Sequence, residues 1–200
     1  MEESQKKLSE LTDRGIPVHF FGGNHDIWTY RYLHDECGVT LYHSPYTEFE
    51  LDGRKVIVGH GDMLGPRPAG QRILSAIFRS RLLQWLFSML HPYWAMMLGK
   101  GWSRSNRTSR PVAHIFRGEE EPIIGFAHEY QRTHPSAPAD LFICGHTHCA
   151  EVYPLPEGGA VAFLGEWIDN PLYGVLGPGG FELKGYPDRA VIGKSGTTRQ

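Results

Sequence analysis

The chain has 200 residues, of which 40% are hydrophobic and 21% charged, with a formal net charge of -2. These values are typical of a soluble globular protein with one sizeable core, and they exclude a disordered or collagen-like chain. The cysteines Cys37, Cys144 and Cys149 are odd in number and lack paired CxxC spacing, so neither a disulfide framework nor a structural zinc site is predicted. A cytoplasmic location is expected, since the charged N-terminus lacks the apolar stretch of an export signal.

The basic residues are unevenly distributed. Residues 63–118 contain nine Arg or Lys residues and no Asp or Glu, while all 22 acidic residues lie elsewhere. This segment is expected to meet an anionic partner; the alternative is a solvated basic face.

Residues 2–14 are predicted to form a helix that ends at Gly15. Three short apolar runs elsewhere each lead through glycine into a polar cluster: 18–21 into GGNHD, 56–58 into GHGD, and 141–144 into GHTH. Such runs are typical of buried strands. If the three strands share one direction in one sheet, the clusters converge at the edge where open α/β sheets bind ligands. The pattern therefore predicts an α/β fold without reference to any family.

The middle of the chain is predicted to be helical. Between Gly70 and Gly101 apolar residues recur every three or four positions, interrupted at His91-Pro92. The uncharged stretch 82–99 is long enough to consider a membrane span, but the His-Pro break and Gln84 favour two short amphipathic helices. We interpret residues 70–112 as a helical cap inserted over the sheet.

The C-terminal half is predicted to contain a helix at 119–131 and, after the GHTH cluster, short strands at 150–155, 161–164, 173–176 and 181–183. Residues 1–185 are interpreted as a single domain and 186–200 as a flexible tail.

Four residues in the polar clusters are candidate metal ligands: Asn24, His60, His146 and His148. One amide oxygen and three imidazoles suit borderline divalent metals. His146 and His148 are two residues apart, so in extended backbone they would project to the same side. Taken singly, each histidine is better explained as a surface or hydrogen-bonded residue than as a ligand; together they predict a metal site.

The clusters GNHD at 23–26, GHGD at 59–62 and GHTH at 145–148 resemble the third, fourth and fifth metal motifs of calcineurin-like metallophosphoesterases. The resemblance implies a sandwich of mixed sheets flanked by helices, and two divalent ions, Mn²⁺ with Fe or Zn as alternatives. It implies that Asn24, His60 and His146 bind the second ion and His148 the first. His25 would donate a proton or hydrogen bond to the phosphate or leaving group, with Asp26 orienting it.

The first two motifs of that family are absent. The sequence contains no Asp-x-His, and Asp62 of the fourth motif is its only Gly-Asp. Fewer than 25 residues precede Asn24, whereas a βαβ unit takes ~30 or more. We therefore expect that the first strands are missing, that the chain begins at an internal methionine, and that the chain alone is an impaired enzyme.

Further segments resemble the UDP-2,3-diacylglucosamine pyrophosphatases of lipid A synthesis in Gram-negative bacteria: 23–28, 36–39, 84–87, 101–104 and 165–168. This branch implies two-metal hydrolysis of a pyrophosphate bond, giving UMP and 2,3-diacylglucosamine 1-phosphate. It also implies a lipid-linked nucleotide substrate, peripheral contact with the cytoplasmic face of the inner membrane, and no nucleic-acid partner.

Candidate substrate contacts lie in and after the cap. They are the phosphate- and sugar-binding candidates Ser103, Arg104, Asn106, Arg107, Arg110, Arg72 and Arg81. The Met- and Trp-rich cap is interpreted as a groove for acyl chains. The alternative is that its apolar residues pack against the sheet and its cations are solvated. Relatives in this branch place a carboxylate shortly after the fourth motif, and residues 64–68 have none.

Two other functions are compatible with the sequence. A calcineurin-like phosphoesterase acting on a soluble substrate would show no detergent dependence. An inactive fragment that binds anionic lipid and lacks the first metal site would hold at most one ion per chain.

Overall fold

The computed structural model describes residues 2–27, 29–97, 100, 115–167 and 170–195. The chain divides into two compact units. The core unit comprises Met1–Pro66 and Phe116–Gln200, and the helical unit comprises Arg67–Ile115. That the helical unit covers the sheet stays a prediction.

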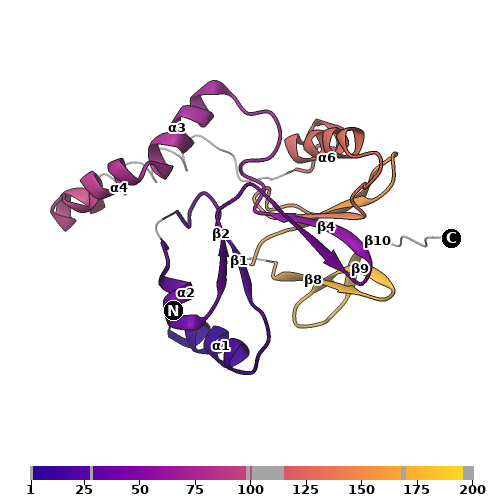
Figure 1. Cartoon of the computed structure of the whole chain (residues 1–200), viewed down its shortest axis with the longest axis horizontal. Helices are drawn as coiled ribbons and strands as arrows, with labels where there is room; N and C mark the ends of the chain where they lie inside the picture. Colours follow the sequence, from indigo (N-terminus) through magenta and orange to yellow (C-terminus); the bar gives the residue numbers. More distant parts are fainter. Residues whose placement is uncertain (1, 28, 98–99, 101–114, 168–169, 196–200) are drawn as a thin grey trace. The chain divides into compact units, whose positions relative to one another are not determined.

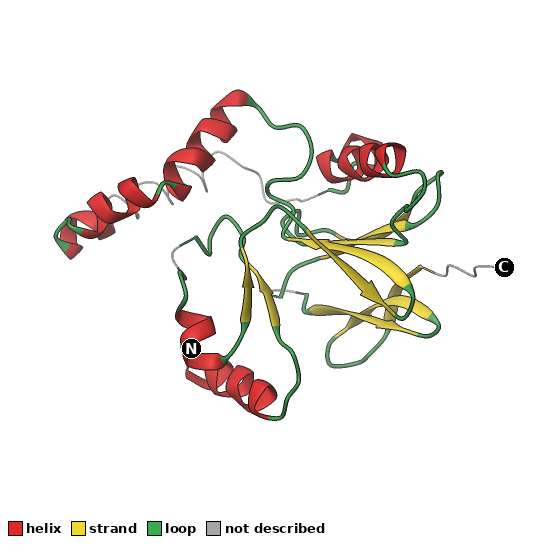
Figure 2. Cartoon of the chain, in the orientation of Figure 1, coloured by secondary structure: helices red, strands yellow, loops and turns green. Residues whose placement is uncertain are grey.

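A five-stranded mixed sheet forms the centre of the core unit (Figures 1 and 2). In spatial order its strands are β3 (Thr47–Leu51), β4 (Arg54–Gly59), β5 (Leu141–Cys144), β7 (Ala160–Leu164) and β6 (Ala150–Pro154). The three inner strands are parallel, and β3 and β6 are antiparallel edges. Asp52 and Gly53 join β3 to β4 with φ of 51° and 69°, the backbone of a tight two-residue hairpin turn.

Successive side chains of the inner strands pack on opposite faces of this sheet. On one face Ile57, Phe142 and Phe163 contact α6 (Pro122–Thr133), which follows a short 3₁₀ helix, η1 (Gly118–Glu120). Each large side chain buried there stabilises the fold by ~1.5–3 kcal/mol. Figure 1 shows α6 on that side of the sheet.

The other face packs against a three-stranded antiparallel sheet: β8 (Leu172–Gly177), β9 (Gly180–Gly185) and β10 (Val191–Ser195). Leu172, Phe181 and Leu183 of this sheet lie in one cluster with Val56 and Leu141. The Arg54 guanidinium also joins the two sheets, donating to the carbonyls of Gly177 and Pro178 at 2.9 and 3.0 Å. The predicted architecture of mixed sheets flanked by helices is confirmed.

The predicted tail at 186–200 is wrong for Val191–Ser195, which forms β10. β10 pairs with β9, and Lys194 Nζ lies 2.7 Å from Glu182 Oε1. Gly193 packs tightly on β6, because an added Cβ would lie 2.8 Å from Cγ2 of Val152. The prediction missed this strand because a short segment containing glycine and lysine carries little of the apolar alternation of a strand.

The N-terminal region forms a separate parallel pair, β1 (His19–Phe21) with β2 (Thr40–Tyr42), next to α1 (Glu2–Asp13) and α2 (Tyr32–Cys37). Gly15, at φ 74°, follows α1 as predicted. Among the described residues β1 pairs only with β2. The hypothesis that one sheet contains β1, β4 and β5 is therefore wrong for β1, which contacts the large sheet through Phe21 and Phe49, with ring centroids 6.1 Å apart.

The helical unit contains α3 (Ala69–Arg79), α4 (Arg81–Ser88) and a helical segment at 92–97. The predicted interruption at His91-Pro92 is confirmed. A second break, at Ser80, was not predicted; its hydroxyl caps α4 by accepting from the Leu83 N–H at 3.4 Å. Within the described ranges we find no helix long and apolar enough to cross a membrane.

Candidate functional site

The loop after β5 carries two of the candidate histidines in an unusual backbone conformation. His146 and His148 have φ of 67° and 57°, in the left-handed region that residues other than glycine seldom occupy. The Thr147 N–H donates to the Gly145 carbonyl at 2.8 Å, which closes a γ-turn centred on His146. The extended backbone predicted for this pair is wrong, because β5 ends at Cys144 and the chain curls immediately afterwards.

The loop after β4 lies beside it. Strands β4 and β5 are parallel neighbours that pair Gly59 with Cys144. One residue further on, the Gly145 N–H donates to the His60 carbonyl at 3.0 Å. The imidazole rings of His60 and His146 have centroids 5.5 Å apart. The predicted convergence of these two clusters is confirmed.

The third cluster forms a tight turn after β1. The Gly23 N–H donates to Asp26 Oδ2 at 3.0 Å, and the Asp26 N–H donates to the Gly23 carbonyl at 3.1 Å. Gly23 is buried against His60, since an added Cβ would lie 2.5 Å from two atoms of that ring. Asn24 and His25 occupy the exposed tip of the turn. All three clusters thus meet around His60, although β1 belongs to a different sheet.

Asp26 takes part in the turn itself, and its predicted role in orienting His25 stays a prediction. The Asp26 carboxylate accepts a hydrogen bond from the Gly23 N–H, and among the contacts of the described residues it accepts none from His25. Asp26 therefore shapes the loop that presents Asn24 and His25.

The candidate ligands carry imidazole and amide groups, which are chemical types that bind divalent cations. The rings of His60 and His146 lie edge to face with centroids 5.5 Å apart, and Asn24 follows Gly23, which packs against His60. Thr147, between His146 and His148 in the chain, has a buried Oγ1 without a hydrogen-bond partner among the described residues. Over the same residues, no group of three or more His, Cys, Asp or Glu side chains is arranged to hold a metal ion. The ligand set Asn24, His60, His146 and His148 therefore stays a prediction.

The predicted substrate contacts lie in the helical unit. Arg72 is on α3 and Arg81 begins α4. The remaining five, Ser103, Arg104, Asn106, Arg107 and Arg110, lie outside the described residues.

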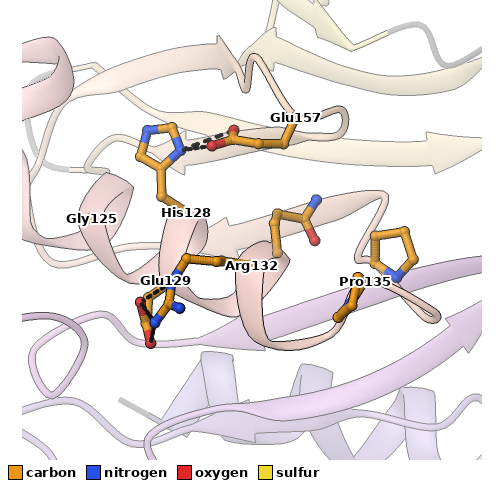
Figure 3. Close-up of a pocket in the computed structure, with 8 residues that line it drawn as sticks. Gly125, His128, Glu129, Arg132, Pro135 and Glu157 are labelled. Carbon is orange, nitrogen blue, oxygen red and sulfur yellow. Dashed lines mark hydrogen bonds and ion pairs between the residues drawn. The ribbon is translucent and has the colours of Figure 1, made fainter.

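A cavity of about 490 Å³ opens along α6 and contains none of the predicted site residues (Figure 3). Glu129, Arg132 and Pro135 line it together with His128 and Glu157. We favour the histidine loops over this cavity as the functional site, because the charged side chains that line the cavity are already paired with each other: Arg132 with Glu129 at 2.6 Å and His128 with Glu157 at 2.9 Å.

His128 bridges two carboxylates at the edge of this cavity. Its Nε2 lies 2.8 Å from Glu119 Oε2 and its Nδ1 lies 2.9 Å from Glu157 Oε1. Burial lowers the pKa of His128, but the hydrogen bonds to Glu119 and Glu157 outweigh it and the pKa is raised. Sequence reasoning missed this cluster, because its three members are far apart in the chain and no local pattern joins them.

A UDP-2,3-diacylglucosamine hydrolase from Porphyromonas gingivalis is 32% identical over 182 residues, covering 84% of this chain and 68% of that protein. The chain belongs to the UDP-2,3-diacylglucosamine hydrolase family. Enzymes with the same name from Histophilus somni and Aeromonas hydrophila are 25% and 26% identical and cover 84% and 86% of the chain.

This family is the branch that the sequence motifs resemble, so that prediction is confirmed. The prediction that the protein is a hydrolase is confirmed with it. No family model matches the chain. A solved structure of an archaeal phosphodiesterase aligns over 95% of this chain and 74% of its own length, with 12% identity and a TM-score of 0.38.

Proposed function

We propose that this protein hydrolyses the pyrophosphate bond of UDP-2,3-diacylglucosamine, giving UMP and 2,3-diacylglucosamine 1-phosphate in lipid A biosynthesis. The observation that carries the proposal is the meeting of His60 and His146, with ring centroids 5.5 Å apart, in a chain of this hydrolase family. Two neighbouring parallel strands, β4 and β5, end just before these residues, and the carboxyl ends of strands are where α/β sheets commonly place ligand sites.

Asn24, His60, His146 and His148 are the proposed ligands of two divalent ions, Mn²⁺ being our preferred identity. Such ions, when bound, supply a deprotonated water as nucleophile and neutralise charge on the phosphoryl oxygens. The protein's own part is to hold imidazole and amide donors at fixed positions, and the hydrogen bond between Gly145 and His60 supports that role.

His25 is the proposed proton donor. It stands at the exposed tip of the turn closed by Gly23 and Asp26, where a substrate phosphate can approach it. A ring nitrogen of His25 would donate its proton to the oxygen of the leaving phosphate. Asp26 would act indirectly, by keeping the turn closed.

The helical unit is proposed to recognise the lipid part of the substrate. Its exposed apolar side chains offer the surface that two acyl chains need: Ile73, Leu82, Trp85, Met89, Trp94, Met96 and Met97. Arg72 and Arg81 in this unit, with Ser103, Arg104, Asn106, Arg107 and Arg110, are the proposed partners of the phosphates and the sugar.

The proposal is tested by measuring UMP release from UDP-2,3-diacylglucosamine in detergent micelles with Mn²⁺. We expect release that stops with a chelator, at a turnover well below the ~10 per second typical of enzymes, because the sequence contains no Asp-x-His. His146→Ala should reduce the rate at least ~100-fold, since even outer partners of metal ligands contribute 10–100-fold. His19→Gln, at an exposed position on β1, is the matched control. Equal rates for His146→Ala and His19→Gln would reject the proposed site.

A further inference from the structure

Two aromatic side chains of the core unit are exposed and stacked on each other. The rings of Trp167 and Tyr186 have centroids 5.8 Å apart and an interplanar angle of 27°, which is an offset arrangement that aromatic pairs prefer. Trp167 is 62% exposed and Tyr186 is 60% exposed. A single exposed apolar side chain needs no explanation, but adjoining ones often mark a binding surface. Because stacking covers one face of a ring, the other faces of this pair remain accessible to a ligand.

The pair follows strands that end at the same edge of the central sheet as the histidine loops. Strands β4, β5 and β7 are parallel, and the register pairs Cys144 near the end of β5 with Phe163 near the end of β7. The histidine loops follow β4 and β5, and Trp167 follows β7. Paired strands are ~4.8 Å apart. The segment that carries Trp167 therefore begins one strand away from the loop that carries His146.

Backbone contacts anchor both sides of the pair. Glu166 forms a β-bridge with Pro171, and Oε1 of Glu166 accepts the Asn170 N–H at 2.9 Å. Tyr186 comes directly after β9, and its N–H donates to the Pro171 carbonyl at 2.9 Å. The segments that carry the two rings are thus tied to each other through Pro171. A flat ligand that stacks on the pair would order little additional backbone, which lowers the free-energy cost of binding.

The proposed function leaves one part of the substrate without a partner, the uracil base. The candidate metal ligands and His25 are assigned to the pyrophosphate, and the helical unit is assigned to the sugar and the acyl chains. Proteins commonly bind an unpaired base by stacking it on aromatic side chains, because every base has a π-face. In a uridine nucleotide one ribose separates the base from the phosphates. The site for the base must therefore lie close to the phosphate site without coinciding with it, as a segment one strand away does.

We infer that Trp167 and Tyr186 form a platform on which the uracil ring of the substrate stacks, so that the pair favours a substrate with an aromatic base. The inference rests on the proposed function. The competing explanation is structural: the two rings only help to hold the segment after β9 in place.

The test is an NMR titration of the metal-free protein with UMP, in which the Kd is taken from backbone amide shifts. The indole N–H signal of Trp167 is identified by its absence from Trp167→Leu, and UMP should shift it. For Trp167→Leu we expect a Kd for UMP about tenfold higher, equivalent to about 1.4 kcal/mol. Trp167→Phe keeps an aromatic face and should bind UMP like the wild type. Trp94→Leu, at a 58% exposed tryptophan of the helical unit, is the matched control and should also bind like the wild type.

Ribose 5-phosphate lacks the base and separates stacking from phosphate binding. It should bind to the wild type more weakly than UMP does, and Trp167→Leu should not change its Kd. Because Trp167 is exposed, its replacement should leave the thermal midpoint nearly unchanged. If Trp167→Leu does not fold, Tyr186→Leu removes the other ring and is judged by the same Kd for UMP.

An unchanged Kd for UMP in Trp167→Leu would overturn the inference, as would equal affinities of the wild type for UMP and ribose 5-phosphate. Tighter binding of glucosamine 1-phosphate than of UMP, lost in Trp167→Leu, would assign the pair to the sugar and would also overturn it. The proposed function fails separately, when His146→Ala and His19→Gln release UMP at equal rates. A wild type that releases UMP as expected, with an unaffected Trp167→Leu, rejects the platform alone.

Discussion

The position of the His60 ring depends on the absence of a side chain at Gly23. The two residues lie in loops that follow strands of different sheets, yet a single added methyl group on Gly23 would overlap the imidazole of His60. The neighbouring Gly22 has ordinary space, because an added Cβ there would be 3.8 Å from its nearest neighbours. Comparing substitutions at Gly23 and at Gly22 therefore separates the effect of crowding His60 from the general effect of replacing a glycine.

Gly23→Ala is expected to displace His60 and to lower the free energy of unfolding by ~1–3 kcal/mol, the usual range for overpacking. UMP release should fall with it, because His60 is a proposed metal ligand. Gly22→Ala should change stability by no more than ~0.5 kcal/mol. Urea denaturation and the UMP assay measure both effects, and equal behaviour of the two variants would contradict the packing argument.

The sign of φ at His146 and His148 is a residue-scale property that the sequence did not reveal. The residue types and their order were sufficient to predict the three clusters, because glycine after an apolar run is a local signal. Whether a histidine occupies the left-handed region depends on the contacts around it, here the hydrogen bond between Gly145 and His60. For that reason the motif identified His146 and His148 as candidate ligands, but the extended backbone predicted for them was wrong.

At the scale of elements, His128 joins three segments. Its imidazole on α6 contacts Glu119 of η1 and Glu157 of the β6–β7 turn, and the Tyr153 hydroxyl on β6 donates to the other oxygen of Glu119 at 2.6 Å. Carboxylates only accept hydrogen bonds, so both ring nitrogens donate only in the protonated form. The bridge is therefore complete when His128 carries its charge.

The pH dependence of stability follows from this bridge. The pKa of His128 is raised in the folded protein: burial opposes the charge, and the hydrogen bonds to Glu119 and Glu157 more than compensate. The contribution of protonated His128 to the free energy of unfolding is therefore fully present below the unfolded-state pKa of about 6.5. It is lost as the pH rises through the pKa of His128 in the folded protein. The loss in thermal midpoint caused by His128→Gln should be larger at pH 6 than at pH 9.

Scanning calorimetry of wild type and His128→Gln at the two pH values measures this difference. Glu157→Gln removes one of the two carboxylates and is the matched control, for which the effect should be smaller. A His128→Gln effect that is equal at both pH values would show that His128 contributes by packing alone.

The elements found from the sequence are those with local signals. The core strands β4 and β5 are apolar runs that end at or just before glycine, and α1 ends before a left-handed Gly15. Strand β10 and the pairing of β1 with β2 were missed, because each is decided by contacts between distant segments. Gly193 is an example. From sequence, a glycine argues against a strand, but in the structure the absence of a side chain at Gly193 allows β10 to approach Val152.

At the scale of the whole molecule, charge and apolar surface coincide in the helical unit. Trp85 and Trp94 are 57% and 58% exposed, and residues 63–118 carry nine basic and no acidic residues. Exposed aromatic side chains combined with basic residues are typical of proteins that bind anionic membrane surfaces. This combination agrees with the peripheral membrane contact that the sequence resemblance implies, which stays a prediction.

The protein should float with vesicles of phosphatidylethanolamine and phosphatidylglycerol, and less so at high salt. Replacing Trp85 and Trp94 by serine should weaken partitioning at least ~tenfold, since one large apolar side chain contributes ~1.5–3 kcal/mol when buried. Trp167→Ser, at a tryptophan of the core unit that is 62% exposed, is the matched control. Equal flotation of all three proteins would reject membrane contact through the helical unit.

The hydrogen bond from Gly145 to His60 continues the ladder of β4 and β5 one step past the ends of the strands. The spacing of paired strands, ~4.8 Å, consequently fixes how far apart the backbones of the two histidine loops begin. Under the proposed function, substitutions in the helical unit would change which lipids are recognised while the distance between the ends of β4 and β5 stays the same. Lipid specificity could then evolve without any change in the histidine loops.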